Sequence, residues 1–261
     1  MRFELKNKTA LVTGGSQGIG KEIALQLARE GVKVALTSGN ETKLKTAAAE
    51  IDAAGGTVVA IPGDARSEVD LIRVAETAQG YFGAIDILVN NVAGIGRIGN
   101  FEEMPAEEWV DLFRINVMSG VILARHLIAR MKEKGWGRIL FMSSERAIEP
   151  KKNLAAYSMT KAGMLALAKG LSNELGEYGI TVNCISPGVI VTPSWDAGAA
   201  SANMSREEFA EQYSQHVLAG DKLGMPEDVA ALVCYLCSDL ARWITGSNFR
   251  VDGGSIKNIQ I

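Results

Sequence analysis

The sequence has little of several features that mark specialised classes of protein. Its 261 residues include only three cysteines, Cys184, Cys234 and Cys237. An odd number of cysteines cannot form a complete disulfide framework, so a reducing compartment is favoured. The two histidines, His126 and His216, lack partners at metal-ligand spacing, and we expect no metal site. The net charge of −3 offers no basic surface for nucleic acid. We therefore expect a small-molecule partner and no nucleic acid.

Long apolar runs are missing at the start of the chain. Residues 1–8 carry several charges and lack the apolar stretch of a signal peptide or a membrane span. We therefore expect a cytoplasmic protein that does not bind membranes. Cys234 and Cys237 do form a Cys-x-x-Cys pattern, which is also found at zinc and redox sites. They lie within the apolar-periodic run 229–236, so packing in the core is the favoured interpretation.

Hydrophobic residues make up 47% of the chain, which is enough to bury the core of one large α/β domain. Short runs rich in Val, Ile and Leu alternate with amphipathic segments, and this alternation is typical of a parallel sheet with helices on both faces. Gly31 and Gly179 each follow an amphipathic segment, as helix-ending glycines do. We predict a single doubly wound α/β domain over residues 1–261, with about seven strands at 10–13, 32–37, 58–61, 85–90, 138–143, 181–186 and 247–251.

Polar or glycine-rich features follow most of the predicted strands. Ligands bind doubly wound sheets at the carboxyl ends of the strands, so these features should meet at one edge. Gly14, Gly18 and Gly20 lie between the first strand and its helix, where glycines let the backbone approach a pyrophosphate at a helix amino end. Such a loop can also be a simple tight turn. Its place after a strand and before a helix favours phosphate binding.

Tyr157 and Lys161 are four residues apart on a predicted helix and share one of its faces. An ammonium group there can stabilise a phenolate and lower the pKa of the tyrosine, which would make Tyr157 an acid/base. Ser144 lies thirteen residues earlier, after the fifth predicted strand. A lone Tyr-xxx-Lys pair is often a solvated helix face. Together with the glycine loop, it indicates a redox enzyme.

With these features the chain resembles the short-chain dehydrogenase/reductase family from Leu5 to Gly254. The family pattern Thr-Gly-xxx-Gly-x-Gly is met by residues 13–20, and the Val-Asp-Gly-Gly ending by residues 251–254. Segments 131–139 and 37–40 look most like the 3-oxoacyl-acyl-carrier-protein reductase branch. The resemblance implies a Rossmann-like fold, a homotetramer and a catalytic tetrad of Asn116, Ser144, Tyr157 and Lys161.

By this resemblance, Tyr157 donates a proton to a carbonyl oxygen while the nicotinamide donates hydride to the carbon. Ser144 adds a hydrogen bond to the oxygen, and Lys161 lowers the pKa of Tyr157 and holds the nicotinamide ribose. Asn116 positions a water on the proton route to Lys161. The expected cofactor contacts are Gly14, Ser16, Gln17, Gly18, Ile19, Gly20, Ser38, Asn40, Asp64, Ala65, Asn90, Tyr157, Lys161, Pro187, Gly188, Ile190 and Thr192.

The turn after the second strand predicts which dinucleotide binds. An NAD site would carry an acidic residue there, and residues 37–40, Thr-Ser-Gly-Asn, have none before Glu41. Ser38 and Asn40 can donate hydrogen bonds to a 2′-phosphate, and Lys43 can approach it. Alternatively, Asn40 only caps the next helix and Lys43 is solvated. Many NADP-using relatives carry Arg or Lys where this chain has Gln17. We expect NADP(H) to be favoured over NAD(H).

The substrate side is less defined by the sequence. Glu145 and Arg146 follow Ser144, and Arg97 follows the fourth strand; each is either a substrate contact or solvated loop charge. An insertion at about 189–225 is expected to cover the site. Its side chains Trp195, Phe209 and Tyr213 would face substrate, or simply pack a surface helix pair.

The loop after the fourth strand reads Asn-Asn-Val-Ala-Gly where the family usually has Asn-Asn-Ala-Gly. This difference makes Asn90 a firmer assignment than Gly94. The expected activity is NAD(P)-dependent interconversion of a ketone, 3-oxoacyl or another small carbonyl compound, and a secondary alcohol. The alternatives are a sugar, polyol or xenobiotic alcohol dehydrogenase, a lyase or epimerase acting through transient oxidation, and a non-catalytic dinucleotide sensor.

Overall fold

The computed structural model describes residues 3–214, 217–219 and 223–257. Its centre is a seven-stranded sheet in the order β3-β2-β1-β4-β5-β6-β7, with every neighbouring pair parallel. Each predicted strand is present, and the ends differ from the predicted ones by at most two residues. The strands are β1 (Thr9–Thr13), β2 (Lys33–Ser38), β3 (Thr57–Pro62), β4 (Ile87–Asn90), β5 (Gly137–Met142), β6 (Ile180–Pro187) and β7 (Asn248–Val251).

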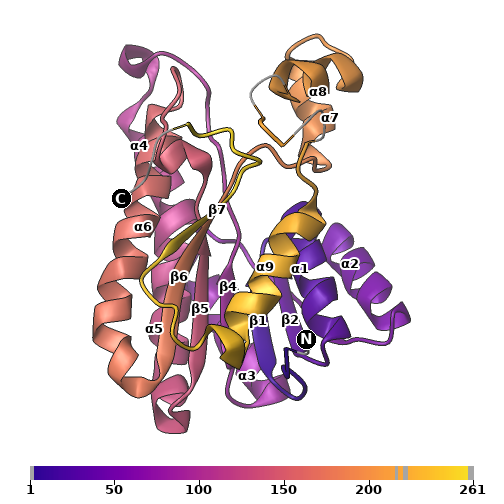
Figure 1. Ribbon diagram of the computed structural model, residues 1–261, viewed down its shortest axis with the longest axis vertical. Coiled ribbons are helices and arrows are strands. Elements are labelled where there is room, and N and C mark those ends of the chain that lie inside the picture. Colours follow the sequence, from indigo (N-terminus) through magenta and orange to yellow (C-terminus); the bar gives the residue numbers. More distant parts are fainter. Residues whose placement is uncertain (1–2, 215–216, 220–222, 258–261) are drawn as a thin grey trace.

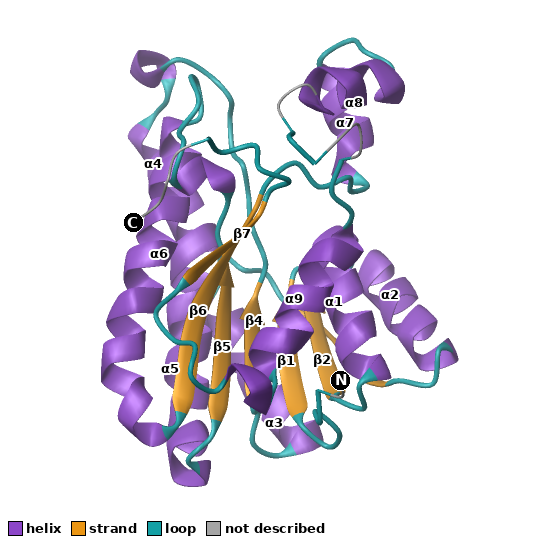
Figure 2. Ribbon diagram, in the orientation of Figure 1, coloured by secondary structure: helices purple, strands orange, loops and turns teal. Residues whose placement is uncertain are grey.

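Helices cover both faces of the sheet (Figure 2). One face packs against α1 (Gly18–Arg29), α2 (Glu41–Ala53) and α9 (Pro226–Cys237). The other packs against α3 (Glu68–Phe82), α5 (Ser119–Lys134) and α6 (Ala155–Leu175). Shorter elements are α4 (Ala106–Phe113), α7 (Ser194–Ser201), α8 (Arg206–Ser214), the π-helical turn η2 (Arg114–Met118) and the 3-10 turns η1 (Phe101–Glu103), η3 (Glu145–Ala147), η4 (Gly176–Tyr178) and η5 (Asp239–Ala241).

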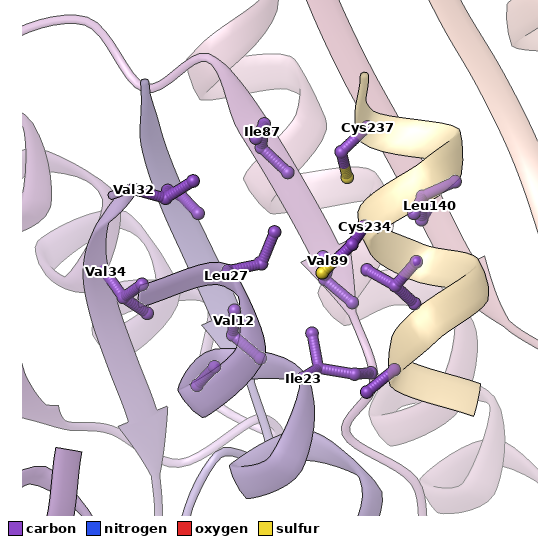
Figure 3. Close-up of a cluster of buried hydrophobic side chains, with 14 of the residues drawn as sticks. Val12, Ile23, Leu27, Val32, Val34, Ile87, Val89, Leu140, Cys234 and Cys237 are labelled. Carbon is purple, nitrogen blue, oxygen red and sulfur yellow. The ribbon is translucent and has the colours of Figure 1, made fainter. Parts of the chain in front are cut away.

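The buried cores confirm the interpretation of the Cys-x-x-Cys pattern. Cys234 and Cys237 are free, buried thiols on the face of α9 that packs against α1 and the sheet. Burial raises the pKa of Cys234 to about 12, so these thiols pack as small apolar groups. Figure 3 shows them beside the aliphatic side chains Val12, Ile23, Leu27, Val32, Val34, Ile87, Val89 and Leu140.

The run Ala106–Lys134 is continuous helix, long and apolar enough to cross a membrane by length and composition alone. Of its most apolar window, 56% is buried inside the domain. Its α5 portion packs against the sheet together with α3 and α6. Burial of this kind is what a core helix of an α/β domain requires.

The strand order reverses between β1 and β4, which are neighbours in the sheet although β2 and β3 intervene in sequence. A crevice for a ligand forms at such a reversal, outside the carboxyl ends of the strands. Helices α7 and α8 lie beyond this edge, at the top of Figure 1. The predicted insertion is therefore positioned over the edge where the polar features of the sequence meet.

Candidate active site

The loop between β1 and α1 is built for close backbone approach. Gly14 and Gly18 have φ values of +64° and +55°, which favour glycine. A Cβ on Gly20 would lie 2.3 Å from the Gly14 carbonyl oxygen and 2.4 Å from Asn91 Nδ2. The Asn91 amide in turn donates to the carbonyl oxygens of Thr13, at 3.0 Å, and Gly14, at 3.3 Å. The loop is thus tied to β4 and leaves no space for side chains at the start of α1, where phosphates bind.

A polar cluster lies where β2 ends. Ser38 Oγ donates to Ser16 Oγ at 3.0 Å, and Lys43 Nζ donates to Gln17 Oε1 at 3.0 Å. Asn40 Oδ1 accepts the backbone N–H of Lys43 at 2.9 Å, so its role as the cap of α2 is confirmed. The Lys43 ammonium reaches back to the glycine loop. The sequence-predicted contacts for a 2′-phosphate therefore come together in one place.

The next two predicted cofactor residues differ in accessibility. Asp64 follows β3 and is exposed, and its carboxylate accepts the backbone N–H of Arg66 at 2.9 Å; Ala65 beside it is half-buried. Asn90 is fully buried, and its Oδ1 accepts from Thr13 Oγ1 and Ser119 Oγ, each at 3.3 Å. The Asn90 side chain therefore packs among the strands instead of lining the cavity. The side chain that lines the cavity comes from Asn91.

A cavity of about 430 Å³ opens at the carboxyl ends of β4, β5 and β6. Ser144, Tyr157 and Lys161 lie on its wall. Five further predicted cofactor residues also line it: Ile19, Pro187, Gly188, Ile190 and Thr192. The glycine loop borders the same region, since Gly18 lies opposite Thr192. Residues from separate parts of the chain are thus gathered around one space.

Ser144 is oriented by the backbone that follows it. It caps the 3-10 turn η3, and its Oγ accepts the backbone N–H of Arg146 at 3.1 Å. The Ser144 hydroxyl proton can then be donated to another oxygen. Its side chain is hydrogen-bonded to Tyr157, which lowers the pKa of that phenol.

Burial nevertheless dominates, and the pKa of Tyr157 is raised above its ordinary value of 10.0. The expected lowering of this pKa by Lys161 stays a prediction, because the shift arises mainly from burial and the Ser144 hydrogen bond. Lys161 Nζ lies 5.6 Å from the ring centroid of Tyr157. Lys161 is buried and Tyr157 is half-buried, and removal of water disfavours the charged form of each.

Lys161 is held at one position by β5. Its ammonium donates to the Met142 carbonyl oxygen at 2.6 Å, and Ser143 Oγ donates to the Lys161 carbonyl oxygen at 2.8 Å. Lys161 is only 1% exposed, and burial lowers its pKa from 10.5 to about 8. Near neutral pH it is a mostly protonated cation fixed beside a neutral phenol.

Asn116 lies in the π-helical turn η2 and is fully buried. Its Oδ1 accepts the N–H of Gly94 at 2.8 Å, and its Nδ2 donates to the Gly94 carbonyl oxygen and to Thr160 Oγ1, each at 2.9 Å. Thr160 Oγ1 donates to the Tyr157 carbonyl oxygen at 2.7 Å. Asn116 thus fixes Gly94 in the loop after β4 and ties that loop to α6. Its side chain is already bonded to protein, and its water-positioning role stays a prediction.

The five predicted substrate residues, Glu145, Arg146, Trp195, Phe209 and Tyr213, all line the same cavity. The ring centroids of the three aromatic residues are 4.8–5.6 Å apart, and Trp195 Nε1 donates to the Ile190 carbonyl oxygen at 2.7 Å. The insertion therefore presents a packed aromatic surface to the cavity. Arg97 lies outside it, at 4.0 Å from a Glu108 carboxylate oxygen.

Sequence reasoning missed several other lining residues. Lys151 follows Pro150 in an irregular segment, and the sequence contains no signal that turns it toward the cavity. Ser255, from the segment after β7, does not line the cavity itself, but its hydroxyl donates to the Glu145 carboxylate; only the fold brings these two residues together. The remaining missed residues are Asn91, Ala93, Ile95, Met142, Ser143, Leu154, Val189, Ser194 and Gly198.

Comparison with known proteins identifies the family that shares this arrangement. A family model described as enoyl-(acyl carrier protein) reductase matches residues 14–255. L-rhamnose 1-dehydrogenase (NAD(P)(+)) of Azotobacter vinelandii is 36% identical over 261 residues, which cover 98% of this chain and 99% of that protein. The chain belongs to the short-chain dehydrogenase/reductase family. As a member of it, the protein is an NAD(P)-dependent oxidoreductase acting on CH–OH and C=O groups.

Two further relatives in the short-chain dehydrogenase/reductase family bear on the branch and the fold. The 3-oxoacyl-acyl-carrier-protein reductase of Aquifex aeolicus is 34% identical over 255 residues, which cover 97% of this chain and 99% of that protein. The crystal structure of L-sorbose reductase from Gluconobacter frateurii, complexed with NADPH and L-sorbose, has a TM-score of 0.95 and 32% identity, with 99% of this chain and 100% of that one covered. The Rossmann-like fold and the resemblance to the 3-oxoacyl reductase branch are thereby confirmed.

Proposed function

We propose that this protein reduces a small ketone, of the 3-oxoacyl or another carbonyl class, to a secondary alcohol with NADPH. The observation that carries the proposal is the position of Ser144, Tyr157 and Lys161 on one wall of a cavity that adjoins the glycine loop. The dinucleotide fits this chain because side chains are excluded where its phosphates would approach. When bound, it would supply the hydride that the protein itself lacks.

The protein's own residues manage the proton and the developing charge. Tyr157 donates its phenolic proton to the carbonyl oxygen, because its raised pKa keeps it protonated near neutral pH. Ser144 donates a second hydrogen bond to the same oxygen, since its own acceptor site is used by Arg146 N–H. The phenolate that remains is stabilised by the Lys161 ammonium and is reprotonated from solvent. Oxidation of an alcohol uses the same groups in reverse.

The preference for NADPH rests on the cluster at the end of β2. Ser16, Ser38 and Lys43 offer two hydroxyls and an ammonium, and the turn 37–40 has no carboxylate to repel a 2′-phosphate. Lys43→Met should raise the Kd for NADPH by about tenfold and leave the Kd for NADH unchanged. Lys45→Met is the matched control, because Lys45 is exposed and paired with Glu41. Equal effects on both cofactors, or a wild-type preference for NADH, would refute this assignment.

A sugar or polyol substrate is the second candidate, because Glu145 and Arg146 give the cavity a carboxylate and a guanidinium beside Ser144. The L-rhamnose and L-sorbose enzymes among the relatives support it. A panel of 3-oxoacyl thioesters, sugars and simple ketones, followed by nicotinamide absorbance, separates the candidates. If none of these compounds led to oxidation of NADPH, a dinucleotide sensor would be favoured. Conversion of a compound without a net change in the cofactor would favour an epimerase or lyase.

We also propose a cytoplasmic homotetramer. Val110 and Phe113 on α4, Met159 on α6 and Trp243, which is 92% exposed, provide apolar surface for contacts between copies. Three free, buried thiols suit a reducing compartment. Light scattering coupled to gel filtration tests the assembly: a monomer at micromolar concentration would contradict it.

A further inference from the structure

The charged side chains around Tyr157 are unequal in sign. Among the described residues that line its cavity, one is acidic, Glu145, and three are basic, Arg146, Lys151 and Lys161. An adjoining hollow of about 450 Å³ shares Glu145, Arg146 and Lys151 and adds one residue of each sign, Glu149 and Lys257. The wall beside the catalytic groups therefore carries excess positive charge, which attracts anions.

Arg146 is the fixed part of this wall. Its guanidinium lies 2.6 Å from a Glu145 carboxylate oxygen and its side chain is 13% exposed. The second Glu145 oxygen accepts the Ser255 hydroxyl, so the pair is held from two directions. A guanidinium has five N–H donors in a planar fork, and one carboxylate oxygen uses only part of them. The others are available to an oxyanion that enters the cavity.

Lys151 is the part of this wall that forms no ion pair with a described carboxylate. Within the described residues its ammonium has no carboxylate within 4.0 Å. The ammonium lies over the Tyr213 ring, 5.9 Å from the ring centroid. Burial and the positive charge of Arg146 lower the pKa of Lys151, while Glu145 and Glu149 raise it. A second anion between the two cations would relieve their mutual repulsion.

We propose that Arg146 and Lys151 bind an oxyanion substituent, carboxylate or phosphate, of the carbonyl substrate while its C=O lies at Ser144 and Tyr157. This inference rests on the proposed function and adds the substrate class. The aromatic surface of Trp195, Phe209 and Tyr213 then contacts the apolar part of the substrate.

The experiment compares ketones that differ only in charge. Levulinate is compared with its methyl ester, and dihydroxyacetone phosphate with dihydroxyacetone, by kcat/KM for NADPH oxidation. We expect at least one anion to exceed its neutral partner by about tenfold, as hydrogen bonds to charged groups allow. The pair that shows the difference identifies carboxylate or phosphate. Equal or higher kcat/KM for both neutral partners would overturn the proposal.

Variants should shift the ratio of kcat/KM for the anionic ketone to kcat/KM for its neutral partner in opposite directions. Lys151→Met should reduce this ratio several-fold by lowering kcat/KM for the anion while kcat/KM for the neutral ketone stays unchanged. Lys151→Arg should restore the ratio. Glu145→Gln, which removes the one acidic group among the described residues of the cavity, should increase this ratio. Lys152→Met is the matched control, because Lys152 is the next residue, is likewise exposed and lines neither hollow. A ratio unchanged in Lys151→Met, or reduced equally by Lys152→Met, would overturn the proposal.

Binding separates this inference from the proposed function. Quenching of intrinsic tryptophan fluorescence by the same four compounds is measured on the NADP⁺-loaded enzyme, whose Trp195 lines the cavity. If no ketone is reduced but levulinate or dihydroxyacetone phosphate binds in a Lys151-dependent manner, the oxyanion site stands and the proposed function fails. Binding that is independent of ligand charge overturns the site.

Discussion

Raising the pH above 8 should stabilise this protein through Lys161, and replacement of that residue should abolish the effect. Burial lowers the pKa of Lys161 from 10.5 to about 8. In the unfolded chain the lysine keeps its proton up to about pH 10.5, whereas in the folded protein it loses the proton from about pH 8. Between these values the unfolded state binds more protons, so the free energy of unfolding rises with pH.

The size of the effect follows from the same two values. The difference corresponds to roughly 3 kcal/mol for a side chain that is 1% exposed. Below pH 8 this free energy is the cost of keeping a charged ammonium in the protein interior. The cost is retained because the cation is needed to stabilise a phenolate at Tyr157.

Equilibrium urea unfolding of wild type and Lys161→Met, at one protein concentration and at steps from pH 7 to 10, isolates this contribution. Other groups titrate in both proteins, so their effects cancel in the difference. We expect the wild type to gain about 2–3 kcal/mol relative to the variant across this range. A difference that stays constant within about 0.5 kcal/mol would refute the assigned burial of the charge.

Substitutions in three further parts of the site test the glycine loop, the support of the tetrad and the insertion. Gly20→Ala should lower the free energy of unfolding by about 1–3 kcal/mol and raise the Kd for NADPH, because the new Cβ would lie 2.3 Å from a backbone oxygen. Gly80→Ala is the control: Gly80 has open space around it in α3, so this substitution should raise the free energy of unfolding by about 0.5–1 kcal/mol. Asn116→Leu should lower both kcat and the free energy of unfolding, the latter by about 1–3 kcal/mol, since it leaves buried backbone groups unpaired. Phe209→Ala and Tyr213→Ala should change the relative rates across a ketone panel.

Each of these three predictions would be contradicted by a specific result. Unchanged NADPH affinity in Gly20→Ala would mean that the loop does not hold the phosphates. Wild-type kcat in Asn116→Leu would remove that residue from the support of the site. Relative ketone rates that do not change in the two aromatic variants would leave the insertion as a structural element only.

The sheet could be predicted from sequence because its strands are buried on both faces and read as continuous runs of Val, Ile and Leu. Some strand ends differ by one or two residues, because pairing with the neighbouring strand, and not the apolar run alone, sets where a strand ends. Pro62, for example, ends β3 although the apolar pattern stops at Ile61. The glycine loop and Tyr157–Lys161 were also predictable, because their spacing is local and fixed by the geometry of a loop and a helix.

What the sequence could not provide depends on contacts between distant segments. The bond from Ser255 to Glu145 spans 110 positions, and Asn116 reaches Gly94 from a π-helical turn that has no sequence signal. The raised pKa of Tyr157 was missed for the same reason. Four-residue spacing shows that a cation is near, but the burial that raises the pKa of the phenol exists only in the folded protein.

The most direct test of the account is the turnover of Tyr157→Phe with a ketone that the wild type reduces. The substitution removes only the hydroxyl at the reacting oxygen, so the Kd for NADPH and the thermal stability should stay close to wild type. We predict a fall in kcat of about 10²–10⁴-fold, the usual contribution of general acid/base catalysis. A variant that keeps more than about a tenth of the wild-type kcat would contradict the assignment of Tyr157 as the proton donor.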